Sequence, residues 1–180
     1  MKPLRSQIPL IFAGIVMIVA CGDPSHDDAV SALGNDPNGI PNGPTHRAGQ
    51  PCLTCHGGSG PGSPQFVIGG TAYAVKGQTD PLVKGMVHLT DATGATYGIP
   101  TNEVGNFYAT TGEWSPVAPI HVSLTLADSE ADMTTHIGRD GSCADCHTAA
   151  IGPRSPGPVY LATDPSDLPG AGSGTGDGGS

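Results

Sequence analysis

Apolar and polar residues alternate along several segments in the middle of the chain, which predicts short β-strands. Val87 and Leu89 fall on one face of such a segment, and His88 between them falls on the other. The same alternation at 120–126 places His121 on the face away from Val122 and Leu124. We therefore expect His88 and His121 to be solvated strand residues. Metal ligation by either histidine is the less favoured alternative.

The predicted strands fill a region of about 66–126. The run 66–73 is extended but is interrupted by Gly69 and Gly70, and turn residues follow at 91–94 and 103–106. The segment 156–161 ends in apolar residues that would either pack on a cofactor or complete a sheet edge. The pattern predicts a mainly β chain with short helices.

The N-terminal segment has the pattern of an export signal. Lys2 and Arg5 precede an apolar stretch at 8–19, which is too short to span a bilayer as a helix. It ends Val19-Ala20-Cys21, which resembles the lipobox of bacterial lipoproteins. The resemblance implies a signal peptide at 1–20, lipidation of Cys21, and a cell-envelope protein held at the outer membrane, facing the periplasm or the surface. An ordinary signal peptide with an incidental cysteine is the alternative.

Composition narrows the remaining classes of function. The chain of 180 residues contains 28 Gly and 18 Pro but only 3 Phe and 1 Trp, so a bound group would help to fill its interior. We expect 21–44 to be a flexible tether and 164–180 a disordered tail. The formal net charge of −9 argues against nucleic-acid binding, which needs a basic surface.

The cysteines carry the most specific signal. Besides Cys21, the four others form two copies of one motif, Cys52-Leu53-Thr54-Cys55-His56 and Cys143-Ala144-Asp145-Cys146-His147. C-x-x-C-H is the attachment signature of c-type haem. Residues three apart share one face of a helical turn, so both thiols can reach one porphyrin, and the next residue is placed to ligate its iron. The motifs therefore predict short helices, with His56 and His147 as proximal ligands.

Three other readings of the cysteines are weaker. Disulfides suit an oxidising compartment. Zinc ligation would require the two pairs to lie closer in sequence, and no βαβ pattern surrounds either pair as in thioredoxin-like proteins. None of these readings accounts for the histidine that follows both pairs.

The two motif regions resemble multihaem cytochromes c, in which a loop histidine upstream of a motif often ligates a neighbouring haem. His46 precedes the first motif and His136 the second. The resemblance implies that both are distal ligands, without saying which serves which iron. Solvated loop histidines are the alternative, and Met133 is a rival ligand whose use would raise the reduction potential. Met86, in a strand pattern, suits packing better.

The central region also resembles the carboxypeptidase-regulatory-like, transthyretin-like β-sandwich, through residues 85–94 and 101–108. That resemblance implies a small β-sandwich insert between the two haem-binding segments of a dihaem domain at 45–163. In this family such modules are scaffolds or binding surfaces without catalytic residues.

These observations predict a lipid-anchored dihaem cytochrome c with two covalently bound haem c groups, an electron carrier rather than an enzyme. Its expected partners are redox proteins, including a larger multihaem conduit, and the membrane through its lipid anchor. A haem enzyme or gas sensor with one five-coordinate iron is the first alternative. A haem-free lipoprotein that binds through the β-sandwich is the second.

Overall fold

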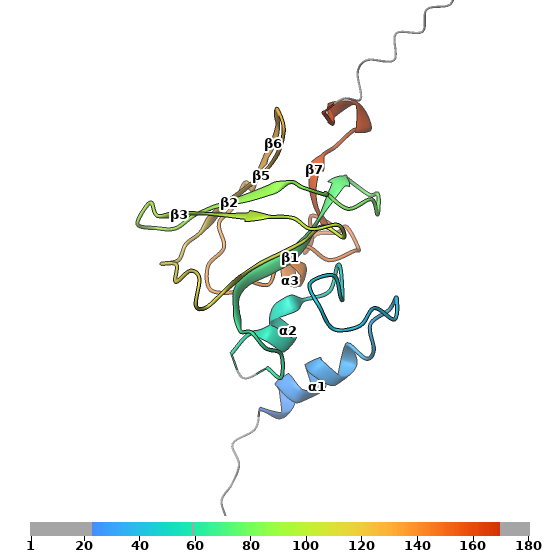
Figure 1. Ribbon diagram of the computed structural model, residues 1–180, viewed down its shortest axis with the longest axis vertical. Coiled ribbons are helices and arrows are strands. Elements are labelled where there is room, and N and C mark those ends of the chain that lie inside the picture. Colours follow the sequence, from blue (N-terminus) through green and yellow to red (C-terminus); the bar gives the residue numbers. More distant parts are fainter. Residues whose placement is uncertain (1–22, 59, 170–180) are drawn as a thin grey trace, which may run out of the picture.

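The computed structural model describes residues 23–58 and 60–169 and has a mainly β fold with short helices, as predicted (Figure 1). Seven strands form two sheets. Their bounds are β1 Phe66–Val75, β2 Met86–Thr90, β3 Thr96–Pro100, β4 Asn106–Thr110, β5 His121–Leu126, β6 Ser129–Asp132 and β7 Val159–Ala162. The helices are α1 Pro24–Ala32, α2 Cys52–His56 and α3 Cys143–Cys146, followed by the 3-10 turn η1 Pro165–Asp167.

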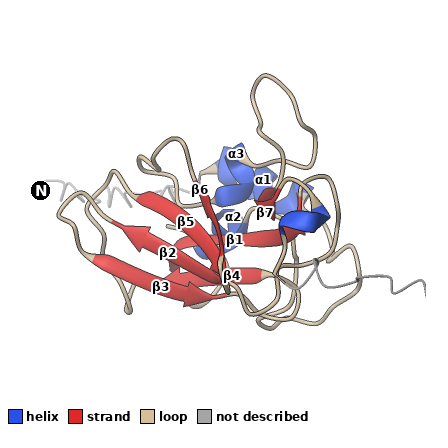
Figure 2. Ribbon diagram, turned by 90° about the horizontal axis from the view of Figure 1, so that it is seen from above, coloured by secondary structure: helices blue, strands red, loops and turns tan. Residues whose placement is uncertain are grey.

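One sheet has the strand order β4-β1-β7 and the other β3-β2-β5-β6 (Figure 2). The first sheet is mixed, because β1 runs antiparallel to β4 and parallel to β7. The second is antiparallel throughout. β6 and β7 lie outside the predicted range of 66–126, so the two-sheet unit extends to Ala162. The prediction that the segment ending at 161 completes a sheet edge is confirmed.

The core contains the residues whose alternation predicted the strands. Val87 and Leu89 of β2 are fully buried together with Ile68 of β1, while His88 is exposed. The His88 ring lies 2.9 Å from the Thr125 hydroxyl on the neighbouring strand β5. The predicted face assignment of His88 is therefore confirmed.

The predicted tether at 21–44 contains a helix in its described part. Asp23 caps α1, because its carboxylate accepts hydrogen bonds from the Ser25 and His26 amides, and Pro24 occupies a first-turn position. Beyond the helix, the chain folds back so that the Arg47 amide donates to the Asp36 carboxylate at 2.6 Å. The described part of the predicted tether therefore contains a helix and a hydrogen bond to the loop that follows it, and its flexibility stays a prediction.

The first residues of the predicted disordered tail form a short turn. The Asp164 carboxylate accepts from the Ser166 amide and begins η1, and Leu168 packs against the core. The Ser129 hydroxyl donates to the Asp167 carbonyl at 2.8 Å, which ties this turn to β6. The predicted signal peptide and Cys21 lie outside the described residues. Within 23–58 and 60–169, no helix is both long and apolar enough to cross a membrane.

Candidate haem-attachment sites

Both C-x-x-C-H motifs form a single helical turn beside the same strand. α2 follows Pro51, which is extended, and α3 follows the extended Ser142. Figure 1 shows both helices next to β1, although the motifs are far apart in sequence. The short helices predicted at the motifs are therefore confirmed, and β1 brings them together.

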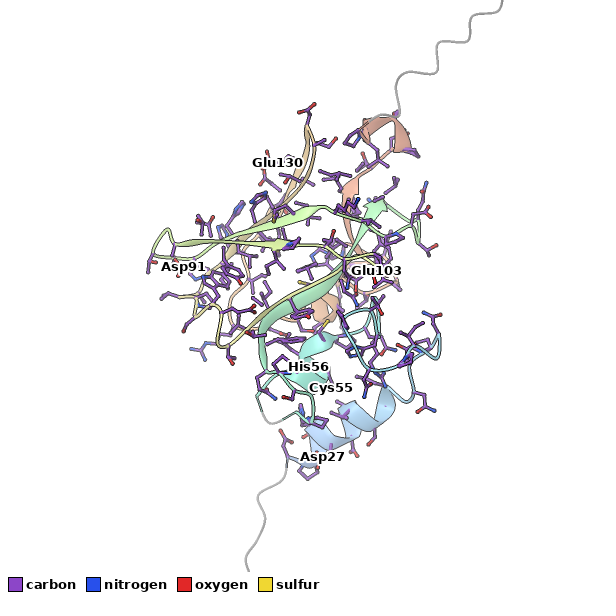
Figure 3. The ribbon with its side chains drawn as sticks, in the orientation of Figure 1. Asp27, Cys55, His56, Asp91, Glu103 and Glu130 are labelled. Atoms are coloured by element: carbon purple, nitrogen blue, oxygen red, sulfur yellow. The ribbon has the colours of Figure 1, made fainter. Side chains whose placement is uncertain are left out.

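The first motif opens onto the larger of two hollows at the motifs, with a volume of about 540 Å³. This volume lies within the range of roughly 300–1,000 Å³ typical of cofactor and ligand pockets. Cys52, Cys55 and His56 line one part of it, and side chains from the 42–50 loop line another. Figure 3 shows Cys55 and His56 together on α2 (Figure 3). The aromatic residues that line the hollow come from strands β1 and β4 and are Phe66, Phe107 and Tyr108.

The His56 ring is held in one orientation. Its Nδ1–H donates to the Pro64 carbonyl at 2.8 Å, and its ring stacks on Phe66 with centroids 4.2 Å apart and planes 7° apart. Tyr108 stacks on the other side of Phe66, with centroids 4.4 Å apart. A carbonyl oxygen can only accept, so Nδ1 carries the proton and Nε2 keeps its lone pair. Nε2 is then the atom available to a metal, as in histidine ligands oriented by a backbone carbonyl.

His46 lies on the same pocket. Its ring centroid is 5.8 Å from that of His56, with the two planes inclined by 48°. Its Nδ1 contacts the backbone of Gly43, which leaves Nε2 uncommitted. The loop itself is fixed by Asn106 of β4, whose side-chain amide donates to the His46 carbonyl at 3.0 Å. The structure thus brings His46 to the first motif, which the sequence alone did not specify.

His147 repeats the geometry of His56. Its Nδ1–H donates to the Gly157 carbonyl at 3.0 Å, so its Nε2 is likewise free to accept a metal. The hollow beside it is small, about 40 Å³, and Tyr73 and Thr71 of β1 line it together with Cys143 and His147. Cys146 is exposed. The two sites therefore differ in size, since the hollow at the first motif is more than ten times larger than the one at the second.

His136 lies elsewhere. Its ring is 5.5 Å from that of His121 at the start of β5, and His121 Nε2 lies 3.9 Å from an Asp132 carboxylate oxygen. His136 is not among the residues that line the hollow at the second motif. Met133 continues β6, with its amide donating to the Val122 carbonyl at 3.0 Å. The structure therefore does not bring either predicted distal ligand of this segment to His147.

The first thiol of each motif is buried and stays protonated at neutral pH. Burial raises the pKa of Cys143 to about 12 and that of Cys52 to about 11. A thioredoxin-like pair needs the opposite, a lowered pKa that supplies a thiolate nucleophile. Across 23–58 and 60–169, no three His, Cys, Asp or Glu side chains are arranged to hold a bare metal ion.

Two glycines have a role at the sites that the sequence pattern did not reveal. A Cβ added to Gly69 would lie 3.2 Å from Cys52 Cβ, and one added to Gly70 would lie 2.7 Å from Cys143 Cβ. A glycine inside a strand often marks a close approach of another chain segment, so the interruption of the 66–73 run was the available signal. These glycines let α2 and α3 pack directly on the β1 backbone.

Comparison with known proteins adds no relatives. No protein-family model matches the chain, and no curated protein or solved structure matches it either. The function is therefore inferred from the chemistry of the two sites.

Proposed function

We propose that the protein is a lipid-anchored dihaem cytochrome c that carries electrons by outer-sphere transfer. One observation supports this most strongly. The histidine of each motif donates Nδ1–H to a loop carbonyl further along the chain, Pro64 for His56 and Gly157 for His147. In each of the two motifs, which lie far apart in sequence, the histidine thus has a free Nε2 and follows a pair of cysteines. Proximal haem ligation requires this arrangement.

Both motifs carry the residue types that haem attachment needs, and the hollow at the first motif has room for a cofactor, whereas the hollow at the second, about 40 Å³, would have to open. Cys52 and Cys55 would hold one haem and Cys143 and Cys146 the other, each thiol adding across one vinyl group. In that addition a C–S bond forms, the thiol hydrogen goes to the terminal vinyl carbon, and nothing leaves, so no oxidant is consumed. Bound haem supplies an iron that cycles between the ferric and ferrous states, and the protein tunes its potential through axial ligands and burial.

We assign His46 as the sixth ligand of the iron on His56, because the two rings share one pocket with both Nε2 atoms uncommitted. The aromatic side chains of this pocket would exclude water from the porphyrin faces. His136 would reach the second iron only after its loop leaves its place beside His121, where Ile137 pairs with Ile120.

The remaining parts of the proposal rest on the sequence. Lipidation of Cys21 would hold the domain at the cell envelope, at the outer membrane. The net charge of −9 favours redox partners with basic surfaces, a larger multihaem conduit among them, and disfavours nucleic acid.

A second candidate function follows from the position of His136. If it stays with His121, the iron on His147 lacks that ligand and can bind a small molecule, as in a haem enzyme or gas sensor. Adding carbon monoxide to the ferrous protein distinguishes the two candidate functions. Binding at one iron supports the sensor or enzyme, and no binding supports the electron carrier.

The decisive experiment is expression of the full chain with a cytochrome c maturation system, followed by haem staining and intact mass. The expected result is two covalent haems per chain. The matched control carries Ala at all four motif cysteines and is expected to bind none covalently. A mass without haem, with the cysteines paired as disulfides, overturns the proposal in favour of a haem-free binding lipoprotein.

A further inference from the structure

The segment 23–42, which contains α1, forms part of the wall of the first site without a core of its own. None of its residues is buried. The half-buried Leu33 directly follows α1 and lines the hollow at the first motif, and Asn42 lines it as well. Figure 1 shows α1 beside α2, the helix that carries the first pair of cysteines. Packing within the segment therefore does not explain why it stays in this place.

Arg47 makes all the hydrogen bonds that join 23–42 to later residues in the described part of the chain. Its guanidinium donates to the Leu33 carbonyl at 3.5 Å and to the Gly34 carbonyl, at the end of α1. Its amide donates to the Asp36 carboxylate at 2.6 Å. A cation is favourable at a helix C-terminus, where carbonyls lack partners within the helix. Arg47 thus holds the whole segment through one residue.

The loop on the other side of Arg47 is fixed independently to the sheet. The Asn106 side chain on β4 donates to the His46 carbonyl at 3.0 Å and to the Pro44 carbonyl at 3.2 Å. Arg47 itself has a φ of +55°, a strained conformation for a residue with a side chain, which persists only where neighbouring contacts hold it. The chain is therefore anchored to the sheet from Pro44 onward, whereas 23–42 depends on Arg47.

Arg47 also belongs to the first site. Its guanidinium donates to the Gln50 side-chain carbonyl at 2.7 Å, and both residues line the hollow together with Cys52 and His56. A group that fills the hollow would cover Leu33, so the apolar surface of Leu33 leaves water only while the segment stays docked. Filling of the hollow and docking of the segment therefore favour each other.

We propose that residues 23–42 form a strap that Arg47 fastens over the first site, and that occupancy of the site and docking of the strap stabilise each other. The inference rests on the proposed function, which places a haem on Cys52 and Cys55, and adds to it a segment that opens and closes. The coupling is reciprocal, because a group that binds better with the strap docked favours the docked state. The strap begins two residues after Cys21, so its release would lengthen the tether to the predicted lipid anchor.

Hydrogen exchange measured by mass spectrometry tests the strap. The unmodified full chain, C52A/C55A and R47A are each matured with haem, and their haem content is measured first by intact mass and by total haem. C52A/C55A is expected to carry one haem fewer than the unmodified chain, and R47A the same number. We expect the amides of 25–42 to exchange roughly tenfold faster in both variants, because the docked strap has lost its occupant in one and its hydrogen bonds in the other.

Two controls accompany the variants. R139A is the matched control for R47A, because Arg139 is exposed and lies outside both the strap and the first hollow. Its strap should exchange as slowly as that of the unmodified chain. The amides of β2 report whether each protein is folded and should exchange at the same rate in all of them. If C52A/C55A fails this check, R47A against R139A decides the inference.

The outcomes separate the strap from the proposed function. If the first motif carries haem but 25–42 exchanges equally in the unmodified chain and both variants, the strap is refuted and the dihaem assignment stands. Faster exchange in R47A with unchanged exchange in a folded C52A/C55A would refute the coupling to the site. If the full chain carries no covalent haem, the proposed function is refuted and this inference with it.

Discussion

The rings of His46 and His56 lie on one pocket with centroids 5.8 Å apart, and each ring uses Nδ1 to contact backbone. His56 comes from a helical turn and His46 from a loop tied to β4 through Asn106. Two histidines held in this way, with both Nε2 atoms uncommitted, are the arrangement that a six-coordinate iron between them needs.

Replacing His46 with alanine is therefore expected to change one haem and spare the other. With its sixth ligand removed, the iron on His56 should become high-spin in the ferric protein and bind carbon monoxide when reduced. Optical and electron paramagnetic resonance spectra of the matured protein measure both changes.

The control for this substitution is H88A, because His88 is exposed on β2 and contacts Thr125 instead of the pocket. Its spectra should match those of the unmodified protein. A fully low-spin H46A spectrum would remove His46 from the iron and leave it a loop histidine.

The free energy of unfolding is expected to depend on apolar side chains buried in the core and much less on exposed ones. Ile68 is fully buried in β1, so I68A should lower the free energy of unfolding by roughly 2–5 kcal/mol through lost burial and the cavity left behind. V83A removes the same kind of side chain from a position that is 39% exposed and should cost less than about 0.5 kcal/mol. Urea unfolding of the two variants measures the difference, and equal losses would contradict the assigned core.

Local patterns predicted much of the fold. The alternation around Val87 and Leu89 predicted buried strand positions because one face of a two-layer β structure is always covered. The motif helices were predictable because the attachment signature itself implies a helical turn. α1 was missed because the polar composition of 21–44 concealed the cap at Asp23.

Long-range relationships were not predictable in the same way. Nothing local to either motif indicates that Cys52 and Cys143 lie against adjacent glycines, because that contact depends on how β1 is placed in the sheet. The partner of His136 likewise depends on the pairing of Ile120 with Ile137, which brings its loop to β5. Loop carbonyls such as Pro64 O carry no signal in the sequence at all.

Asp91 is expected to make stability depend on pH in acid. Hydrogen bonds from the Thr93 hydroxyl and the Val117 amide hold the pKa of its carboxyl at about 2, below its ordinary value of 3.8. A lowered pKa in the folded state means that the carboxylate contributes its full stabilisation above pH 3.8 and loses it as the pH falls through about 2.

The D91N variant should therefore unfold at a lower temperature at neutral pH and show a flatter decline between pH 4 and 2, because its amide cannot accept from both partners. Thermal unfolding across this pH range measures the effect. Asp128, which is exposed after β5, supplies the control D128N. Figure 3 shows Asp91 at the end of the β2–β3 hairpin, away from Cys55 and His56, so haem content should be unchanged. If the unfolding temperatures of D91N and the unmodified protein fell in parallel with pH, the stabilising role assigned to the Asp91 carboxylate would be contradicted.

Two turn glycines with the same backbone conformation are expected to respond differently to alanine. Gly94 and Gly105 have φ values of +84° and +79°, so alanine is strained at both, by about 1–2 kcal/mol. At Gly94 an added Cβ meets nothing within 4 Å, whereas at Gly105 it would lie 2.2 Å from the Ala72 carbonyl oxygen. G105A must therefore also displace the 102–106 turn from β1, where the Ala72 amide donates to the Gly105 carbonyl at 2.9 Å. Chemical unfolding should show a clearly larger loss for G105A than for G94A, and equal losses would mean that conformation alone, and not contact with β1, selects glycine at 105.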